Sequence, residues 1–306
     1  MSDKLKGFSY RIAPFLASFF LLLLAALLFW QNAEVQKAAS RAYRVCLGSL
    51  VPTLFPFMIL GDLWNRIAPS PVSRSSKQAP FPFFRTLGRC VLQGAFLGFP
   101  IAAAAATAEV ERNRCSLLWG AKALLLSNNP GPAFLIAGVG AGLFKSWRLG
   151  ALFYLCNWFS SALTLLLLNR WISVSKAHTS APAKDDAFSM RMRYHAINML
   201  SVCGCVLFFS IICGVLSAVL PTPLSNIIVS LSEIGSAAAF FSAVNTQASL
   251  LFFAFATGFG GFSVFLQTLP YLSALGLSPK TYFIYKALQG GILTCLIALA
   301  LRFPSF

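Results

Sequence analysis

The chain has 306 residues, of which 58% are hydrophobic and only 10% are charged. A soluble domain of this length has too little interior for so much apolar surface, so the composition excludes an ordinary water-soluble protein and favours one surrounded by lipid. The formal net charge of +16 comes from 24 Lys and Arg against 8 Asp and Glu. These charges lie between apolar runs, which is typical of the positive-inside rule and argues against nucleic-acid binding.

The N-terminal region, residues 1–44, predicts one membrane span followed by a surface helix. Lys4, Lys6 and Arg11 precede an apolar run over residues 13–30, close to the ~20 residues that a span needs. Because no small-residue cleavage site follows, we expect an uncleaved span with a cytoplasmic N-terminus. Residues 31–44 have the pattern of an amphipathic helix.

Residues 45–169 form a first predicted unit of interrupted apolar segments. Residues 45–64 contain two prolines, which kink or interrupt a helix. Residues 65–89 are basic and rich in Pro and Ser, and we expect a cytoplasmic loop there. Residues 90–110 carry Gly98 and Pro100 in their middle, which fits either a full span of small residues or a re-entrant hairpin.

The stretch Ser127-Asn128-Asn129-Pro130-Gly131-Pro132 is the most informative of this unit. One interpretation is a helix broken at mid-membrane, whose free backbone groups and polar side chains contact a ligand. A half-helix that starts near Pro132 would then direct its positive end at an anionic group. The other interpretation is an ordinary loop between two short spans. Residues 149–168 follow as an uninterrupted span.

The basic segment 170–195 is the predicted cytoplasmic linker to a second unit, residues 196–306. This unit begins and ends with the apolar spans 197–220 and 282–301. Between them lie two further apolar segments, residues 224–244 and 249–270. Gly258–Ser263 interrupts the second of these, either as a bend that exposes Ser263 and Gln267 to a ligand or as a small-residue packing face. Interruptions at corresponding places of two halves indicate the binding site of a transporter.

Glu233 is the acidic residue within the apolar segments of the second unit. An intramembrane carboxylate suggests a cation or proton site. A helix end in contact with water is the alternative. Lys122 and Lys286 are candidate partners of Glu233 or contacts for an anion, and the alternative is that both extend to the membrane interface. The histidines, His178 and His195, lie in or beside the linker, and the sequence has no phosphate-binding loop, so we expect no enzyme, metal or cofactor.

Five short motifs together resemble a known family. They are VPTLFPFMIL, GAFLGFPIAAA and LSNNPGPAFLIAGVGAGLF in the first unit, and LSEIGSA and GFGGFSVFLQ in the second. In this order they are similar to motifs of the sporulation integral membrane proteins of the YlbJ type, which carry the nucleoside recognition (Gate) domain. Leu97, Phe99 and Ala102 depart from the family pattern. The resemblance implies two Gate-like repeats, residues 45–169 and 196–306, with a fold like that of nucleoside transporters, and passage of dipicolinate, a small aromatic dianion, into the developing spore.

We therefore expect an all-α polytopic membrane protein of two repeats with broken helices and helical hairpins, in a bacterial cell or forespore membrane. Its expected function is transport of a small polar or anionic solute, with Glu233 coupling a cation or proton. A non-transporting assembly factor is the alternative. Besides solute and lipid, a homo-oligomer or other membrane proteins are left open as partners. The predicted substrate-binding residues are Ser127, Asn128, Asn129, Gly131, Gly261, Ser263 and Gln267.

Overall fold

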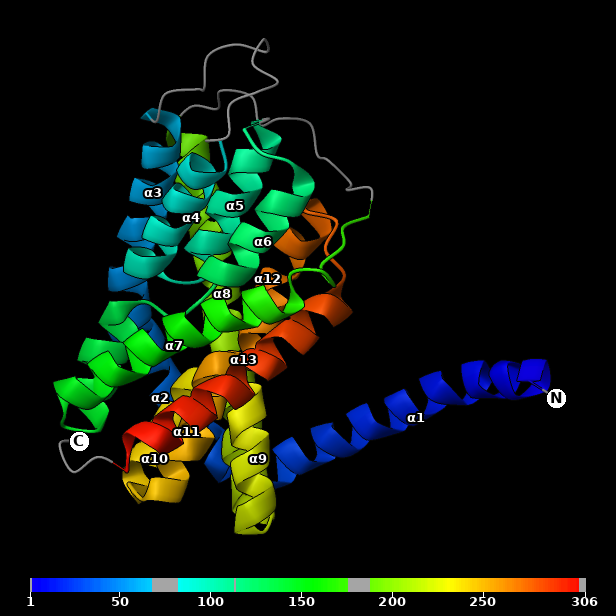
Figure 1. Ribbon diagram of the computed structural model, residues 1–306. Coiled ribbons are helices and arrows are strands. Elements are labelled where there is room, and N and C mark those ends of the chain that lie inside the picture. The colour runs from blue at the N-terminus through cyan, green and yellow to red at the C-terminus, as the bar shows by residue number, and fades with distance from the viewer. Residues whose placement is uncertain (1, 68–81, 113, 176–187, 303–306) are drawn as a thin grey trace.

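The computed structural model describes residues 2–67, 82–112, 114–175 and 188–302. The described residues form α-helices and two π-helical segments, without a β-sheet (Figure 1). The elements of the N-terminal region and first half are α1 (Ser2–Trp30), α2 (Asn32–Val45), η1 (Cys46–Leu50), α3 (Val51–Ile67), α4 (Pro82–Leu97), α5 (Ile101–Glu111), α6 (Leu117–Ser127), η2 (Ala133–Leu143) and α7 (Trp147–Leu168). Those of the second half are α8 (Phe188–Val219), α9 (Thr222–Ser232), α10 (Ile234–Val244), α11 (Gln247–Phe259), α12 (Gly261–Ala274) and α13 (Pro279–Ala300).

The chain is a polytopic membrane protein, as its composition predicts. In the described residues, four helical stretches are long and apolar enough to cross a bilayer: Trp147–Leu168, Ser189–Val219, Gln247–Ala274 and Pro279–Ala300. A fifth is added if Ser18–Trp30 and Asn32–Gly48, which meet at 88°, count as one bent span. Figure 1 shows α1 extending away from the rest of the molecule, whereas α2 packs along α8.

Two boundaries differ from the sequence predictions. The sequence predicts a polar loop for 82–89, which is instead the first half of α4, and it assigns 188–195 to the linker, although these residues begin α8. Both segments are polar because they are the ends of helices that continue into apolar runs, and polarity alone does not separate a helix end from a loop. The remaining parts of the two predicted segments include 68–81 and 176–187, which lie outside the described residues.

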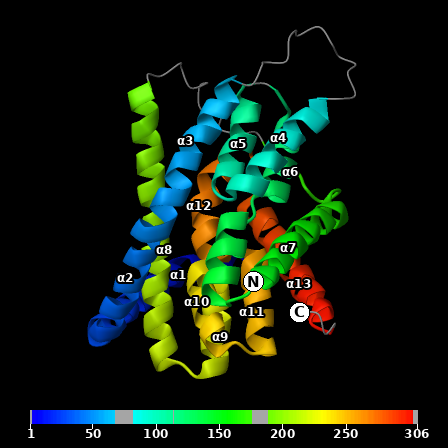
Figure 2. The same ribbon diagram turned by 90° about the vertical axis from the view of Figure 1, so that its left-hand side faces the viewer.

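The two halves have the same order of elements. Each has an entering helix (α3 or α8), a pair of short helices (α4–α5 or α9–α10), a broken helix (α6–η2 or α11–α12) and a closing helix (α7 or α13). In Figures 1 and 2 the pair α4–α5 lies in the upper part and α9–α10 in the lower part, and the two broken helices run in opposite directions. This arrangement is that of an inverted repeat.

Both short-helix pairs are hairpins whose tips lie inside the protein. The helices α4 and α5 pack against each other, as do α9 and α10. Residues 90–110 therefore form a hairpin bent at Gly98, as one of the two interpretations has it, and do not form one continuous helix. The turn contains Gly98, with φ of 72°, and a cis peptide bond between Phe99 and Pro100.

Two apolar cores lie at opposite ends of this arrangement. One joins α5, α6, α12 and the start of α13, through residues such as Ala106, Leu124 and Leu272. The other joins η2, α7, α10, α11 and the end of α13, through residues such as Leu135 and Phe253. The first core thus combines the hairpin α4–α5 and α6 with α12 of the second half. The second core combines the hairpin α9–α10 and α11 with η2 of the first half. The helix breaks lie between the two cores.

Candidate functional site

The first hairpin tip packs directly on the first helix break. The backbone N–H of Phe99 donates to the carbonyl of Asn129 over 3.0 Å. A Cβ built on Gly98 would lie 2.5 Å from the backbone nitrogen of Gly131, so only a glycine permits this approach. The tip of α4–α5 thereby supports the unwound segment between α6 and η2.

The second half repeats this contact with different residues. A Cβ built on Gly261 would lie 2.8 Å from the carbonyl oxygen of Ser232, the last residue of α9. Gly260 and Gly261 have φ of 81° and 79°, in the left-handed region, and they form the bend between α11 and α12. Each hairpin tip therefore lies against the break of the helix that follows it in the chain.

A cavity of about 560 Å³ lies where these four interruptions converge. The tips contribute Leu97, Phe99 and the segment 233–236, and the breaks contribute Pro130, Gly131 and Ser263. The helices α2, α3 and α8 complete the wall. Its volume is within the ~300–1,000 Å³ that is usual for small-molecule sites.

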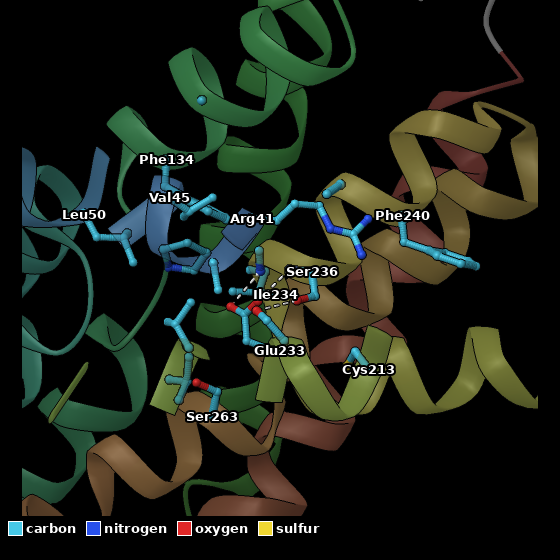
Figure 3. A pocket seen from close by; sticks show the side chains of 18 of the residues that line it. Arg41, Val45, Leu50, Phe134, Cys213, Glu233, Ile234, Ser236, Phe240 and Ser263 are labelled. Atoms are coloured by element: carbon cyan, nitrogen blue, oxygen red, sulfur yellow. Dashed lines mark hydrogen bonds between the residues drawn. The ribbon is translucent and has the colours of Figure 1, made fainter. Parts of the chain in front are cut away.

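The wall of the cavity is largely apolar, with a few polar groups. The aromatic side chains include Phe99, Phe134 and Phe240, while Ser210, Ser217, Ser236, Ser263 and Gln267 supply hydroxyl and amide groups. Figure 3 shows Arg41 of α2 on the wall together with Glu233 and Ser263. A site of this composition suits a small solute with a flat apolar part and a few hydrogen-bonding groups.

The predicted site residues fall into two groups. Gly131, Ser263, Gln267 and Glu233 line the cavity. The structure places Ser127, Asn128, Asn129 and Gly261 outside its wall, although all four are buried at the helix breaks. Residues 127–130 of the polar break are therefore buried in protein, and Gly131 and Pro132 are half-buried, so the break is not a solvent-exposed turn.

Glu233 is the N-cap of α10. Its two carboxylate oxygens accept hydrogen bonds from the backbone N–H groups of Gly235 and Ser236, at 2.8 and 2.5 Å. Figure 3 shows the carboxylate turned back onto the start of this helix. Glu233 is only 4% exposed, and neither Lys122 nor Lys286 forms an ion pair with it, contrary to the pairing considered from the sequence. The positive end of α10 holds a carboxylate of the protein itself.

A polar network surrounds the first break from the other side. The Asn129 side-chain oxygen accepts from Gln289 Nε2 at 2.8 Å, and Gln289 also donates to Asn157 Oδ1 at 2.9 Å. Asn128 Nδ2 donates to the hydroxyl of Tyr282 at 2.8 Å. These five side chains are at most 2% exposed, so the network lies wholly in the interior.

Sequence reasoning missed Asn157 of α7 and Tyr282 and Gln289 of α13, and it considered Lys286 only as a partner of Glu233. Tyr282, Tyr285, Lys286 and Gln289 have the i, i+3, i+4, i+7 spacing of one helix face, in a helix that is otherwise apolar. A polar stripe on a membrane-spanning helix is a recognisable signal for an internal polar site. The overall hydrophobicity of residues 282–301 predicts an uninterrupted span and does not reveal this stripe.

Comparisons with protein-family models, with curated proteins and with solved structures find no match to this chain. The functional argument therefore depends on the geometry described above.

Proposed function

We propose that the protein transports a small solute across the membrane and binds it in the cavity between the two hairpin tips. One observation carries this proposal: the tips of two oppositely directed hairpins and the breaks of two discontinuous helices line the same cavity. Substrate sites of secondary transporters lie at such an interface, because the inverted repeats can rock about it. Irregular backbone at this depth is tolerated only where protein or a cavity surrounds it.

The cavity wall suggests a solute that is aromatic and polar. Phe99 and Phe134 supply flat apolar contacts, Ser263 and Gln267 supply hydrogen bonds, and Arg41 supplies a positive charge. Dipicolinate, the substrate class implied by the resemblance to the sporulation proteins, has this chemistry. Because Glu233 caps α10 itself, an anionic group of the solute would bind nearer Arg41 or Gln267 than that helix end.

In this proposal Glu233 couples transport to a proton or cation. Its carboxylate is buried, lines the cavity and is held by backbone N–H groups at a hairpin tip. Protonation weakens both hydrogen bonds and releases the tip, so a change of charge at Glu233 is linked to the conformation of the hairpin.

Uptake into proteoliposomes tests the proposal. Dipicolinate and nucleosides are the first solutes to measure, with the Gln267→Leu variant against the parent protein. We expect uptake of at least one solute, and a loss of about tenfold or more in Gln267→Leu while its unfolding temperature stays unchanged. The matched control is Gln247→Leu at the exposed start of α11, which does not line the cavity and should transport normally.

A labelling experiment separates a transporter from an assembly factor. Ser236→Cys, in a background without the eight native cysteines, places a thiol on the cavity wall, and Ser160→Cys places one in the closed interior of α7. A solute site predicts that a water-soluble thiol reagent modifies position 236 but not 160, and that the transported solute protects it. If both positions are inert and no solute is taken up, the assembly role is the better explanation.

A further inference from the structure

The ammonium group of Lys286 lies in a cage of oxygen atoms at the end of α6. Its Nζ donates to Gln289 Oε1 at 2.7 Å, to the Asn128 carbonyl at 3.2 Å and to Asn129 Oδ1 at 3.4 Å. Lys286 is 1% exposed, and the three residues that accept are fully buried. In the described part of the chain, no carboxylate lies within ion-pair distance of this lysine.

Three neutral oxygens take the place of a counter-ion. An ammonium has three N–H donors and no acceptor, so three acceptors satisfy it completely. Leaving a buried charge with fewer partners would be very costly. The acceptors are a backbone carbonyl and two side-chain amides, which carry only partial negative charge, and the charge of Lys286 is therefore not neutralised by another residue.

The helix end supplies further electrostatic stabilisation. Asn128 is the C-cap of α6, where the last carbonyl groups lack helical partners and the helix dipole is negative. The other carbonyls of this end already have donors: Ser161 Oγ donates to Leu126 O at 3.0 Å, and the Asn129 backbone N–H donates to Ser127 O at 2.8 Å. The Asn128 carbonyl is the one that receives a cation.

This donor set is the kind that binds a small monovalent cation. Hard cations prefer carbonyl and amide oxygens, and unwound helix ends in transporters coordinate Na⁺ in this way. The side chain of Asn128 carries a further buried oxygen, Oδ1, with no hydrogen-bond partner among the described residues. The ammonium of Lys286 thus occupies a position at which free Na⁺ or K⁺ would satisfy the same atoms.

We propose that the oxygen cage of Asn128, Asn129 and Gln289 is a monovalent-cation site whose resident cation is the tethered ammonium of Lys286. The break between α6 and η2 is consequently held without a free metal ion. Removal of the Lys286 side chain lets a small cation from solution bind to the same oxygen atoms. This inference does not depend on the transport proposal, because it concerns the stability of the fold.

Chemical rescue of Lys286→Ala tests this assignment. The unfolding temperature of purified protein is measured in choline, sodium, potassium and methylammonium chloride at one ionic strength. We expect the parent protein to be insensitive to the choice of cation. The variant should unfold at a lower temperature in choline, which is too large for the cage. Methylammonium or Na⁺ should raise its unfolding temperature by about 2–5 °C at tenfold excess over its dissociation constant.

Two control variants make the result specific. Lys286→Met fills the space without a charge and should show no rescue. Lys122→Ala removes another buried lysine, whose Nζ lies 4.7 Å from the centre of the Trp119 ring rather than in an oxygen cage. It should show no selectivity among the cations either.

The proposal is overturned if Lys286→Ala is as stable as the parent, or if its unfolding temperature is the same in all four salts. Should this variant fail to fold in choline, the yield of monodisperse protein from synthesis in each salt becomes the measurement. Recovery in methylammonium or Na⁺ alone supports the cation site, and equal failure in every salt refutes it.

Discussion

Alanine substitution of Gly98 should strongly destabilise the protein, because this residue joins the first hairpin tip to the first helix break. Its φ of 72° costs an L-residue about 1–2 kcal/mol. The added Cβ would also lie 2.5 Å from the Gly131 nitrogen and 3.1 Å from the Asn129 carbonyl. Overlap of this kind in a packed interior costs about 1–3 kcal/mol. We therefore expect Gly98→Ala to lower the free energy of unfolding by about 2–5 kcal/mol.

Three other glycines separate the cost of the positive φ from the cost of the steric overlap. Gly260 has a φ of 81°, but a Cβ there would make ordinary contacts at 3.6 Å, so Gly260→Ala should cost only about 1–2 kcal/mol. Gly258 is helical, and its Cβ would lie 2.7 Å from Gly290 Cα, so Gly258→Ala should show the overlap alone. Gly291 is helical with open space around it, and Gly291→Ala should stabilise α13 by about 0.5–1 kcal/mol.

Thermal unfolding of the four purified variants in the same detergent is the assay. With about 2–4 °C per kcal/mol, Gly98→Ala should unfold roughly 4–20 °C below the parent. The unfolding temperatures of Gly260→Ala and Gly258→Ala should lie between those of Gly98→Ala and the parent. The unfolding temperature of Gly291→Ala should equal or exceed that of the parent. If Gly98→Ala is no less stable than Gly260→Ala, the hairpin tip does not pack on the break as the structure has it, and the geometry of the cavity must be revised.

Three further changes test other parts of the interior by the same unfolding assay. Tyr285→Phe removes the hydroxyl that donates to the Ser161 carbonyl at 2.6 Å and should cost about 1 kcal/mol; no loss would mean that this bond is not formed. Glu233→Ala removes the N-cap of α10 and should cost about 0.5–2 kcal/mol, and a stabilised variant would contradict the capping role. Glu109→Gln breaks the 2.9 Å ion pair with the buried Arg114 and should lower the free energy of unfolding by about 3–5 kcal/mol. Glu34→Gln breaks the exposed pair with Lys37 in α2 and should leave the free energy of unfolding nearly unchanged.

The sequence predicted the spans and interruptions because both have strong local signals. Uniform apolar runs predicted α7 and α13 to within three residues of their ends, and they predicted the apolar part of α8 but not its polar first turns. The prolines, glycines and asparagines of 127–132 marked the break before η2. Hydrophobicity and breaker residues act within a few positions of the chain, so they can be read without knowledge of the fold.

The function of the side chains at the breaks could not be read in this way. The sequence indicates that Asn128 and Asn129 need partners, but it does not say whether solute or protein provides them. In the structure the partners are other side chains of the protein. Tyr282 contacts Asn128 and Gln289 contacts Asn129, each from more than 150 positions away in the chain. Glu233 shows the same limit, since only its position at a helix start shows that backbone N–H groups satisfy its carboxylate.

Each apolar core depends on both halves of the chain, which predicts that neither half is stable alone. The core around Leu124 is completed by Leu272 and Tyr285 of the second half, and the core around Phe253 is completed by Leu135 of the first. We expect chains 1–175 and 188–306, expressed separately, to aggregate or be degraded. Each half alone would expose the apolar side chains that it contributes to both cores. Expressed together, they should co-purify and unfold in one cooperative transition. A first half that is monodisperse and cooperative by itself would show that the broken helices do not cross between the cores, and the shared cavity would lose its structural basis.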